Sequence, residues 1–380
     1  MKSIPVSLMR GGTSKGVFML RSDLPDDTTE RDKILLQLIG SPDPYSKQIN
    51  GLGGATSSTS KVVVVDKSNR QNIDVDYLFG HVAIKEPVID YSGNCGNLTS
   101  AVGVFAIEQG LIENVTSPIT EVRVWQENLG QTIIVNVPVD EQKQVITKGD
   151  TKLAGVTGKG APIVIDFIKP GNGDESLVLP TGKVKELLEV DYYGSFEVSL
   201  VQAGNATVFV REFDLGLSGK EIYDEINNND ELLKKVEAIR CSASVKMGLT
   251  KTIEEAKQRP GTPKLAFVNK PRNYINSQGE KIKANEMDVY ARIFSMGKLH
   301  HAFTGTGAIA IAVAANIPNT IVADCLLKTQ KQSQPLRIGH TAGTLECSAV
   351  VSINNENWIT EKASLVRTAR TLLRGDACIN

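Results

Sequence analysis

Residues 93–110 read GNCGNLTSAVGVFAIEQG, and this stretch decides the fold. From Leu98 to Gln109 the segment is almost wholly apolar, and its apolar residues are not confined to one stripe. A helix that is apolar all round is buried all round. Gly110 is typical of the end of such a helix. The stretch therefore predicts a buried helix of about three turns, with Cys95 in its first turn and a polar N-terminus that opens to a site.

The position of Cys95 predicts a reactive thiol. The first N–H groups of a helix have no acceptor within the helix, and with the helix dipole they favour an anion, either a thiolate or a bound carboxylate. A cysteine at such a position has a lowered pKa. The alternative is a small buried residue that only packs at the helix start, and the flanking glycines and asparagines favour the reactive interpretation.

The bulk composition is that of an ordinary globular protein. The length of 380 residues suggests about two domains. The formal net charge of −1 gives no broad positive electrostatic potential that would attract nucleic acid or an anionic membrane. We expect no signal peptide and no membrane span, and therefore a cytoplasmic location. The five cysteines form no CxxC pair, which indicates free thiols, four of them structural: Cys241, Cys325, Cys347 and Cys378. The four histidines show no spacing typical of metal ligands, and the adjacent pair at 300 and 301 would point opposite ways in a strand.

The first half of the chain predicts strands that alternate with two helices. A helix is expected at about residues 29–39, and the Gly/Ser/Thr-rich loop 51–60 leads into Lys61. Strands are expected at 4–9, 16–20, 62–65, 73–84, 121–126, 131–138 and 163–168. Residues 169–174 predict a linker.

The second half repeats this plan. A charged amphipathic helix or helix pair is expected over about 219–238, and residues 308–315 form a second segment that is apolar all round. Strands are expected at 196–202, 207–213, near 264–268, at 286–295, and within 336–352 and 363–378.

Two self-similarities predict a duplication. Residues 17–18 (VF) precede 23–24 (DL) at the spacing at which 208–209 (VF) precede 214–215 (DL). A Cys-Gly-Asn turn at 95–97 opens the first apolar helix, and a Thr-Gly-Thr turn at 304–306 opens the second.

These features resemble the diaminopimelate epimerase-like fold. The resemblance implies an α+β protein of two pseudo-symmetric domains, each a curled, mostly antiparallel sheet around a central buried helix, with the active site in the cleft between them. It places residues 1–180 and 365–380 in the first domain and 181–364 in the second, so that the last strand returns to the first domain. Epimerases of this fold carry a Cys-Gly turn at both helix starts. Here Thr304 replaces the second cysteine, which argues against a two-thiol racemase or epimerase.

The whole chain more closely resembles the PrpF family of aconitate and methylaconitate isomerases. The resemblance rests on residues 9–16 (MRGGTSKG), 57–61 (SSTSK), 93–98 (GNCGNL), 304–307 (TGTG) and 338–340 (IGH). In that family a lysine after the Ser/Thr-rich loop and the helix-start cysteine lie beside a bound tricarboxylate. The matching catalytic positions here are Lys61 and Cys95.

The resemblance implies an intramolecular isomerase that transposes a C=C bond. A base removes an allylic proton from an aconitate-like tricarboxylate, and the proton returns at the far end of the allyl system. One acid/base group on one face suffices, which fits a site that keeps one thiol. We expect Lys61 and Cys95 to share this work while helix N–H groups hold the developing dienolate charge. Which of the two removes the proton stays open, and the reaction calls for no metal or organic cofactor.

A substrate with several carboxylates needs several anion sites, and the chain offers them in its polar turns. The candidate binding residues are Arg10, Thr13, Ser14, Lys15, Ser57, Ser58, Asn94, Gly96, Asn97, Thr304, Gly305, Thr306, Gly307 and His340. For three of these residues an alternative without a binding role stays open: Arg10 as an ion-pair partner, Lys15 as a solvated side chain and His340 as a loop residue.

Several rival interpretations stay open. Residues 305–310 match the dinucleotide pattern G-x-G-x-x-G/A, but the polar stretch before them gives no preceding strand. Within the isomerases, a methylitaconate Δ-isomerase and an oxalomesaconate-type tautomerase share the proton chemistry. A non-catalytic accessory partner of a methylcitrate dehydratase is a further alternative, against which the retention of Lys61 and Cys95 speaks. Propionate catabolism by the methylcitrate cycle is the expected context, and a homodimer is possible.

Overall fold

The computed structural model describes residues 2–171, 177–219, 221–328, 332 and 334–379. The chain forms two compact units, Met1–Asp166 with Val366–Asn380, and Phe167–Leu365. The sequence places the first boundary between the domains at residues 180 and 181, whereas the first segment of the first compact unit ends at Asp166. The predicted domain bounds stay a prediction. Of the predicted linker over 169–174, residues 172–174 lie outside the described part of the chain.

The first unit contains the first predicted helices and strands. Its helices are α1 (Thr28–Ile39) and α2 (Thr99–Glu108), with the short 3-10 turn η1 (Arg21–Asp23). Its strands are β1 (Lys2–Gly11), β2 (Ser14–Leu20), β3 (Lys61–Lys67), β4 (Val75–Val82), β5 (Ile89–Asp90), β6 (Ile119–Gln126), β7 (Gln131–Pro138), β8 (Thr151–Lys152), β9 (Lys159–Gly160) and β22 (Ala369–Ile379), and β10 (Ile163–Ile168) contains the first boundary between the units.

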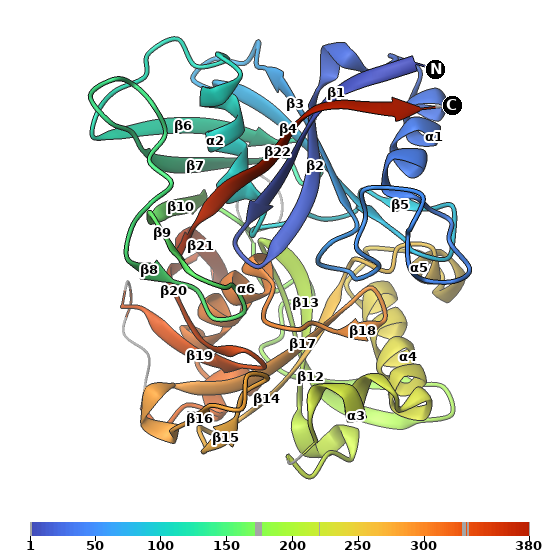
Figure 1. Ribbon diagram of the computed structural model, residues 1–380. Helices are drawn as coiled ribbons and strands as arrows, with labels where there is room; N and C mark the ends of the chain where they lie inside the picture. The colour runs from blue at the N-terminus through green and yellow to red at the C-terminus, as the bar shows by residue number, and fades with distance from the viewer. Residues whose placement is uncertain (1, 172–176, 220, 329–331, 333, 380) are drawn as a thin grey trace. The chain divides into compact units, whose positions relative to one another are not determined.

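Seven strands of the first unit form a mostly antiparallel sheet, and β8 and β9 form a separate two-stranded one. The order of the seven-stranded sheet is β22–β1–β2–β3–β4–β6–β7, and only β2 with β3 and β4 with β6 run parallel. The last strand returns to the first one, as the resemblance implies. It pairs with β1 from Lys2 opposite Ile379 to Gly11 opposite Ala369, and Figure 1 shows the two strands side by side in blue and red.

The second unit has its own helices and strands. Its helices are α3 (Tyr223–Asn227), α4 (Asp230–Lys246), α5 (Ile253–Lys257), α6 (Gly305–Ala315) and α7 (Ile321–Asp324), with the 3-10 turns η2 (Glu212–Leu215) and η3 (Ala284–Glu286). Its strands are β11 (Glu186–Val190), β12 (Gly194–Ala203), β13 (Asn205–Arg211), β14 (Lys264–Asn269), β15 (Tyr274–Ile275), β16 (Lys281–Ile282), β17 (Val289–Ser295), β18 (Lys298–Leu299), β19 (Leu336–His340) and β20 (Gly343–Asn354), and β21 (Asn357–Arg367) contains the second boundary between the units.

The sheet of the second unit repeats the pairing pattern of the first. Its order is β11–β12–β13–β14–β17–β19–β20–β21, and only β13 with β14 and β17 with β19 run parallel. The short strands β5 and β18 pair with β4 and β17 in the same antiparallel sense. The central helix follows that short strand in both units. The predicted duplication is therefore confirmed by the order and direction of the strands.

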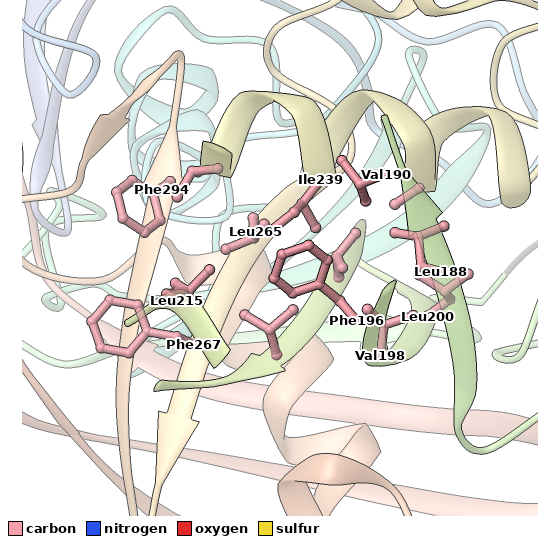
Figure 2. Close-up of a cluster of buried hydrophobic side chains, with 14 of the residues drawn as sticks. Leu188, Val190, Phe196, Val198, Leu200, Leu215, Ile239, Leu265, Phe267 and Phe294 are labelled. Carbon is pink, nitrogen blue, oxygen red and sulfur yellow. The ribbon is translucent and has the colours of Figure 1, made fainter. Parts of the chain in front are cut away.

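Both central helices are buried, as their all-round apolar sequences predict. In α2 the side chains from Thr99 to Ala106 are buried, and in α6 every residue is buried. The opposite face of each sheet packs against an amphipathic helix. Figure 2 shows Leu265 and Phe267 of β14 in one cluster with Ile239 of α4. The corresponding cluster in the first unit joins β3 to α1.

Two sequence expectations need correction. The helix expected to end near residue 238 continues as α4 to Lys246, because Val236, Ile239 and Ala243 extend its buried stripe by two more turns. His300 and His301 do not point opposite ways. They lie in a loop after β18, where their rings stack with centroids 4.7 Å apart. Across the described residues, no helix combines the length and the apolar character that crossing a lipid bilayer needs.

Candidate functional site

The structure brings the two predicted catalytic residues of the first unit into contact. Lys61 is the first residue of β3, and its side chain is buried with only 4% exposed. Its Nζ donates to Ser14 Oγ at 2.9 Å and to Cys95 Sγ at 3.3 Å. Cys95 Sγ lies 3.8 Å from Ser14 Oγ. The three side chains come from β2, from β3 and from the turn before α2, and they form one buried polar cluster.

Cys95 lies just before the helix rather than in its first turn. The helix α2 begins at Thr99, and Cys95 occupies the turn that leads into it. The Cys95 carbonyl accepts from Thr99 N–H at 3.0 Å, and its Sγ accepts from Leu98 N–H at 3.5 Å. The thiol accepts the N–H three residues further on, as a capping side chain does, although Leu98 and not Cys95 is the cap residue of α2. The predicted place of Cys95 in the first turn of the helix is therefore corrected, and the Leu98 N–H is the group at the helix start that lowers the pKa of the thiol.

The surroundings of Cys95 favour the thiolate. Burial by itself raises the pKa of a thiol. At Cys95 the Lys61 ammonium, together with the Leu98 N–H and Ser14, outweighs burial, so the pKa of Cys95 is lowered. Two other buried thiols show the opposite effect. Burial raises the pKa of Cys241 to about 12 and that of Cys325 to about 11. All five cysteines are free, as predicted.

A second layer of polar groups holds the cysteine turn. Burial raises the pKa of Tyr77 well above its usual value. Its hydroxyl therefore stays protonated and donates to Asn94 Oδ1 at 3.2 Å. Asn97 Nδ2 donates to Thr13 Oγ1 at 3.0 Å, and Asn97 Oδ1 accepts from Arg367 Nε at 2.8 Å. Sequence reasoning missed Tyr77 and Arg367, because neither lies near a motif.

The predicted anion-binding residue Arg10 donates hydrogen bonds to backbone carbonyls of the first unit. Arg10 donates to the carbonyls of Gly12 at 3.0 Å and Thr368 at 2.7 Å. This guanidinium thus ties the first turn to the start of β22.

The loop before Lys61 is held in the same manner. Lys15 N–H donates to the Ser58 carbonyl at 2.9 Å, and Ser58 Oγ lies 3.0 Å from Thr56 Oγ1. His81 Nε2 lies 2.8 Å from the carbonyl oxygen of Ser57. Because β4 places His81 opposite Lys61, this histidine links the loop to the polar cluster. The binding roles of Arg10, Lys15, Ser57, Ser58 and Gly96 stay predictions.

The second unit repeats the capping geometry without a thiol. Thr304 Oγ1 accepts from Gly307 N–H at 3.1 Å, the relation that Cys95 Sγ has to Leu98 N–H. Gly307 has no room for a side chain, since a Cβ there would lie 2.3 Å from Ile293 Cδ1. Gly305 and Thr306 complete the first turn of α6, and both are buried.

His340 lies at the end of β19 and is buried. Its Nδ1 accepts from Ala342 N–H at 3.3 Å, and its ring centroid lies 6.3 Å from that of Phe303. Phe303 directly precedes the turn that starts α6, so His340 borders that turn. Its role in binding stays a prediction.

Comparisons with known proteins agree on family and fold. The sequence model of the family described as PrpF protein matches residues 1–380. A 2-methyl-aconitate isomerase of Shewanella oneidensis is 46% identical over 382 residues, which cover 98% of this chain and 96% of that protein. A crystal structure of a methylitaconate-delta-isomerase is 38% identical, with a TM-score of 0.77 over 99% of this chain and 95% of the other.

A more distant structure shows the fold alone. A probable proline racemase from Agrobacterium radiobacter is 12% identical, with a TM-score of 0.58 over 99% of this chain and 93% of the other. The predicted α+β, epimerase-like fold is therefore confirmed.

Proposed function

The chain belongs to the PrpF family, and from that membership we propose that it isomerises an aconitate-like tricarboxylate by allylic proton transfer at Lys61 and Cys95. Named relatives of the chain are isomerases, and the chain is an enzyme of that class. The single observation that supports the residue assignment is the contact of 3.3 Å between Lys61 Nζ and Cys95 Sγ inside a buried cluster.

The chemistry follows from that contact. A thiolate beside an ammonium and a thiol beside an amine differ only in the position of one proton. Either atom can therefore take a proton from the allylic carbon and return it to the far end of the allyl system. The low local dielectric strengthens the hydrogen bond between the two groups and the attraction of the Lys61 ammonium for a substrate carboxylate. The N–H groups at the start of α2 are in a position to hold the developing negative charge of the dienolate.

The preferred substrate is 2-methylaconitate or aconitate, because the 2-methyl-aconitate isomerase is the relative with 46% identity over nearly the whole chain. A methylitaconate Δ-isomerase or an oxalomesaconate-type tautomerase is the alternative within the same chemistry. The accessory role without catalysis is set aside, since the chain is an isomerase by its relatives and carries the acid/base pair.

The remaining expectations are part of this proposal and stay predictions. They are an action without metal or organic cofactor, a cytoplasmic location, a place in propionate catabolism by the methylcitrate cycle, a homodimer, and functional pairing with a methylcitrate dehydratase.

A substrate panel tests the proposal. The purified protein is incubated separately with cis-aconitate, trans-aconitate, 2-methylaconitate and 3-methylitaconate, and proton NMR follows the position of the double bond. We expect turnover of one or more aconitates at a rate at least ten times that of 3-methylitaconate. A preference for 3-methylitaconate would favour the alternative, and no reaction with any of the four would contradict the proposal.

A further inference from the structure

Gln48 is a buried glutamine whose backbone adopts an uncommon conformation. It lies in the connection between α1 and β3, it is 2% exposed, and its φ of 49° is in the left-handed region. Residues other than glycine are uncommon in that region, so the surrounding structure must hold the backbone there. The Asp43 carboxylate does so, because it accepts from the N–H groups of Lys47 at 2.7 Å and Gln48 at 2.5 Å. The turn 43–48 therefore fixes the backbone from which the Gln48 side chain extends.

The Gln48 amide joins three parts of the chain. Its Nε2 donates to Ser41 Oγ, just after α1, at 2.9 Å. Its Oε1 accepts from Ala55 N–H at 2.7 Å and from Ser60 Oγ at 2.8 Å, both in the Gly/Ser/Thr-rich loop. An amide oxygen has two lone pairs and can accept both bonds at once. Gln48 thus connects the loop before Lys61 to the segment that follows α1.

The Gly/Ser/Thr-rich loop is packed closely around this amide. The N–H groups of Leu52 and Gly53 donate to the carbonyls of Leu38 at 2.7 Å and Ile39 at 3.1 Å, at the end of α1. A Cβ on Gly53 would lie 2.2 Å from Gln48 Oε1, so a glycine is needed there. The start of the loop is therefore anchored to α1 and its end to Gln48.

The end of this loop determines where Lys61 points. Ser60 directly precedes Lys61, which is the first residue of β3 and lies one residue before the pairing with β2 begins. Successive side chains of a strand point to opposite faces. Ser60 accordingly reaches Gln48, whereas Lys61 reaches Cys95. The hydrogen bond from Ser60 to Gln48 thus holds the strand end from which the Lys61 side chain extends.

We infer that Gln48 is a positioning residue, which acts through Ser60 to hold the Lys61 ammonium beside the Cys95 thiol. This inference rests on the proposed function, because it gives Gln48 a part in the proton transfer at Lys61 and Cys95. The attraction between an ammonium and a thiolate weakens as their distance grows, and a small misplacement of a reacting group lowers the rate by a large factor. Loss of the Gln48 amide should therefore change the acidity of Cys95 as well as the stability of the protein.

Gln48→Met tests the inference, because methionine keeps the length of the side chain and removes its three hydrogen bonds. Iodoacetamide labelling across a pH series gives the half-maximal pH for Cys95 without requiring turnover. We expect that pH to be higher in Gln48→Met than in the wild type, since an ammonium that lies further away favours the thiolate less. With the preferred acid of the substrate panel, kcat should fall about 3- to 30-fold while KM changes less than about threefold.

Thr120→Val is the matched control for lost hydrogen bonds. Thr120 is 1% exposed, and its Oγ1 holds a loop by accepting from Thr116 N–H and donating to the Thr116 carbonyl, both at 2.9 Å. It lies at the start of β6, whereas Lys61 faces the end of the parallel strand β4. Thr120→Val should lower the melting temperature and leave the half-maximal pH of Cys95 and kcat unchanged.

Ser60→Ala keeps the test decisive if Gln48→Met does not fold. It removes the hydrogen bond between Ser60 and Gln48 and leaves that of Ala55 in place. We expect a smaller rise in the half-maximal pH of Cys95. An unchanged half-maximal pH in Ser60→Ala or in folded Gln48→Met, even with a lower melting temperature, would overturn the inference. That result with normal wild-type isomerisation would leave the proposed function standing, whereas a wild type that isomerises no acid of the panel would remove both.

Discussion

At the scale of residues, the site depends on one ammonium that offsets the burial of one thiol. Cys95, Cys241 and Cys325 are all buried, yet only Cys95 has a lowered pKa. Cys95 and Cys241 each contact a cation, Lys61 Nζ at 3.3 Å and Arg240 Nη2 at 3.1 Å. At Cys241, however, burial and the adjacent Glu237 carboxylate outweigh the cation. Sequence reasoning could name Lys61 and Cys95, but not their distance, because 33 residues of loop and strand separate them in the chain and only the register of β3 fixes where the lysine points.

Replacement of Lys61 by alanine should therefore raise the pKa of Cys95. The ammonium is lost while burial remains, and burial disfavours the thiolate. Iodoacetamide labelling across a pH series, read out by peptide mass spectrometry, gives the half-maximal pH for Cys95. We expect the half-maximal pH to lie lower in the wild type than in Lys61→Ala, with Cys241 as the internal control. Equal profiles in the two proteins would show that Lys61 does not set the acidity of the thiol.

Ser14→Ala should lower kcat about 5- to 50-fold without abolishing activity. The change removes the oxygen that accepts from Lys61 Nζ at 2.9 Å, and an ammonium that loses a buried acceptor costs about 1–3 kcal/mol. Steady-state kinetics measure the effect, and Ser7→Ala, a buried serine on β1, is the control. A kcat equal to that of the wild type would exclude Ser14 as a positioning residue.

At the scale of elements, the two central helices are the features from which the sequence predicts the fold. Both sequences are apolar all round, and both helices are buried. Features that depend on how strands pair in the folded protein could not be predicted from the sequence. Lys264 of β14 occupies the strand position equivalent to that of Lys61 on β3, but it follows no Ser/Thr-rich loop, so only the strand register shows this equivalence. The end of α4 also lies beyond the sequence expectation, because its buried stripe continues through Ile239 and Ala243.

Gly103→Ala should destabilise the protein although alanine normally favours a helix. A Cβ at Gly103 of α2 would lie 2.8 Å from Val137 Cγ2 and 2.9 Å from Val135 Cγ1 on β7. Overpacking of this kind costs about 1–3 kcal/mol, more than the gain in helix propensity. Thermal unfolding measures the effect. Gly375→Ala, where a Cβ would meet no atom within 4 Å, is the control and should be neutral. A Gly103→Ala protein as stable as the wild type would mean that α2 is packed less tightly against β7.

At the scale of the whole molecule, the fold is a duplication whose first unit is closed by the last strand. The pairing directions repeat strand by strand in the two units, as the two sequence self-similarities predict. The self-similarities could not give the exact boundary between the units, because β10 and β21 each run through it as one continuous strand.

Deletion of residues 369–380 should unfold the first unit selectively. It removes β22, which pairs with β1 along its length and receives an Arg10 hydrogen bond just before its start. Hydrogen–deuterium exchange should show lost protection of α2 amides while α6 amides stay protected. Retained protection in α2, or equal loss in both helices, would contradict the division into units.

The proposed isomerisation depends on proton transfer at the contact between Lys61 and Cys95. The most direct test is the rate at which 2-methylaconitate takes up deuterium from D₂O, followed by proton NMR with the wild type, Cys95→Ser, Lys61→Ala and the buried-thiol control Cys241→Ser. We predict deuterium uptake by the wild type and by Cys241→Ser, and a rate about 10²- to 10⁴-fold lower in each site variant. Near-normal uptake by both Cys95→Ser and Lys61→Ala would show that proton transfer does not occur at this contact.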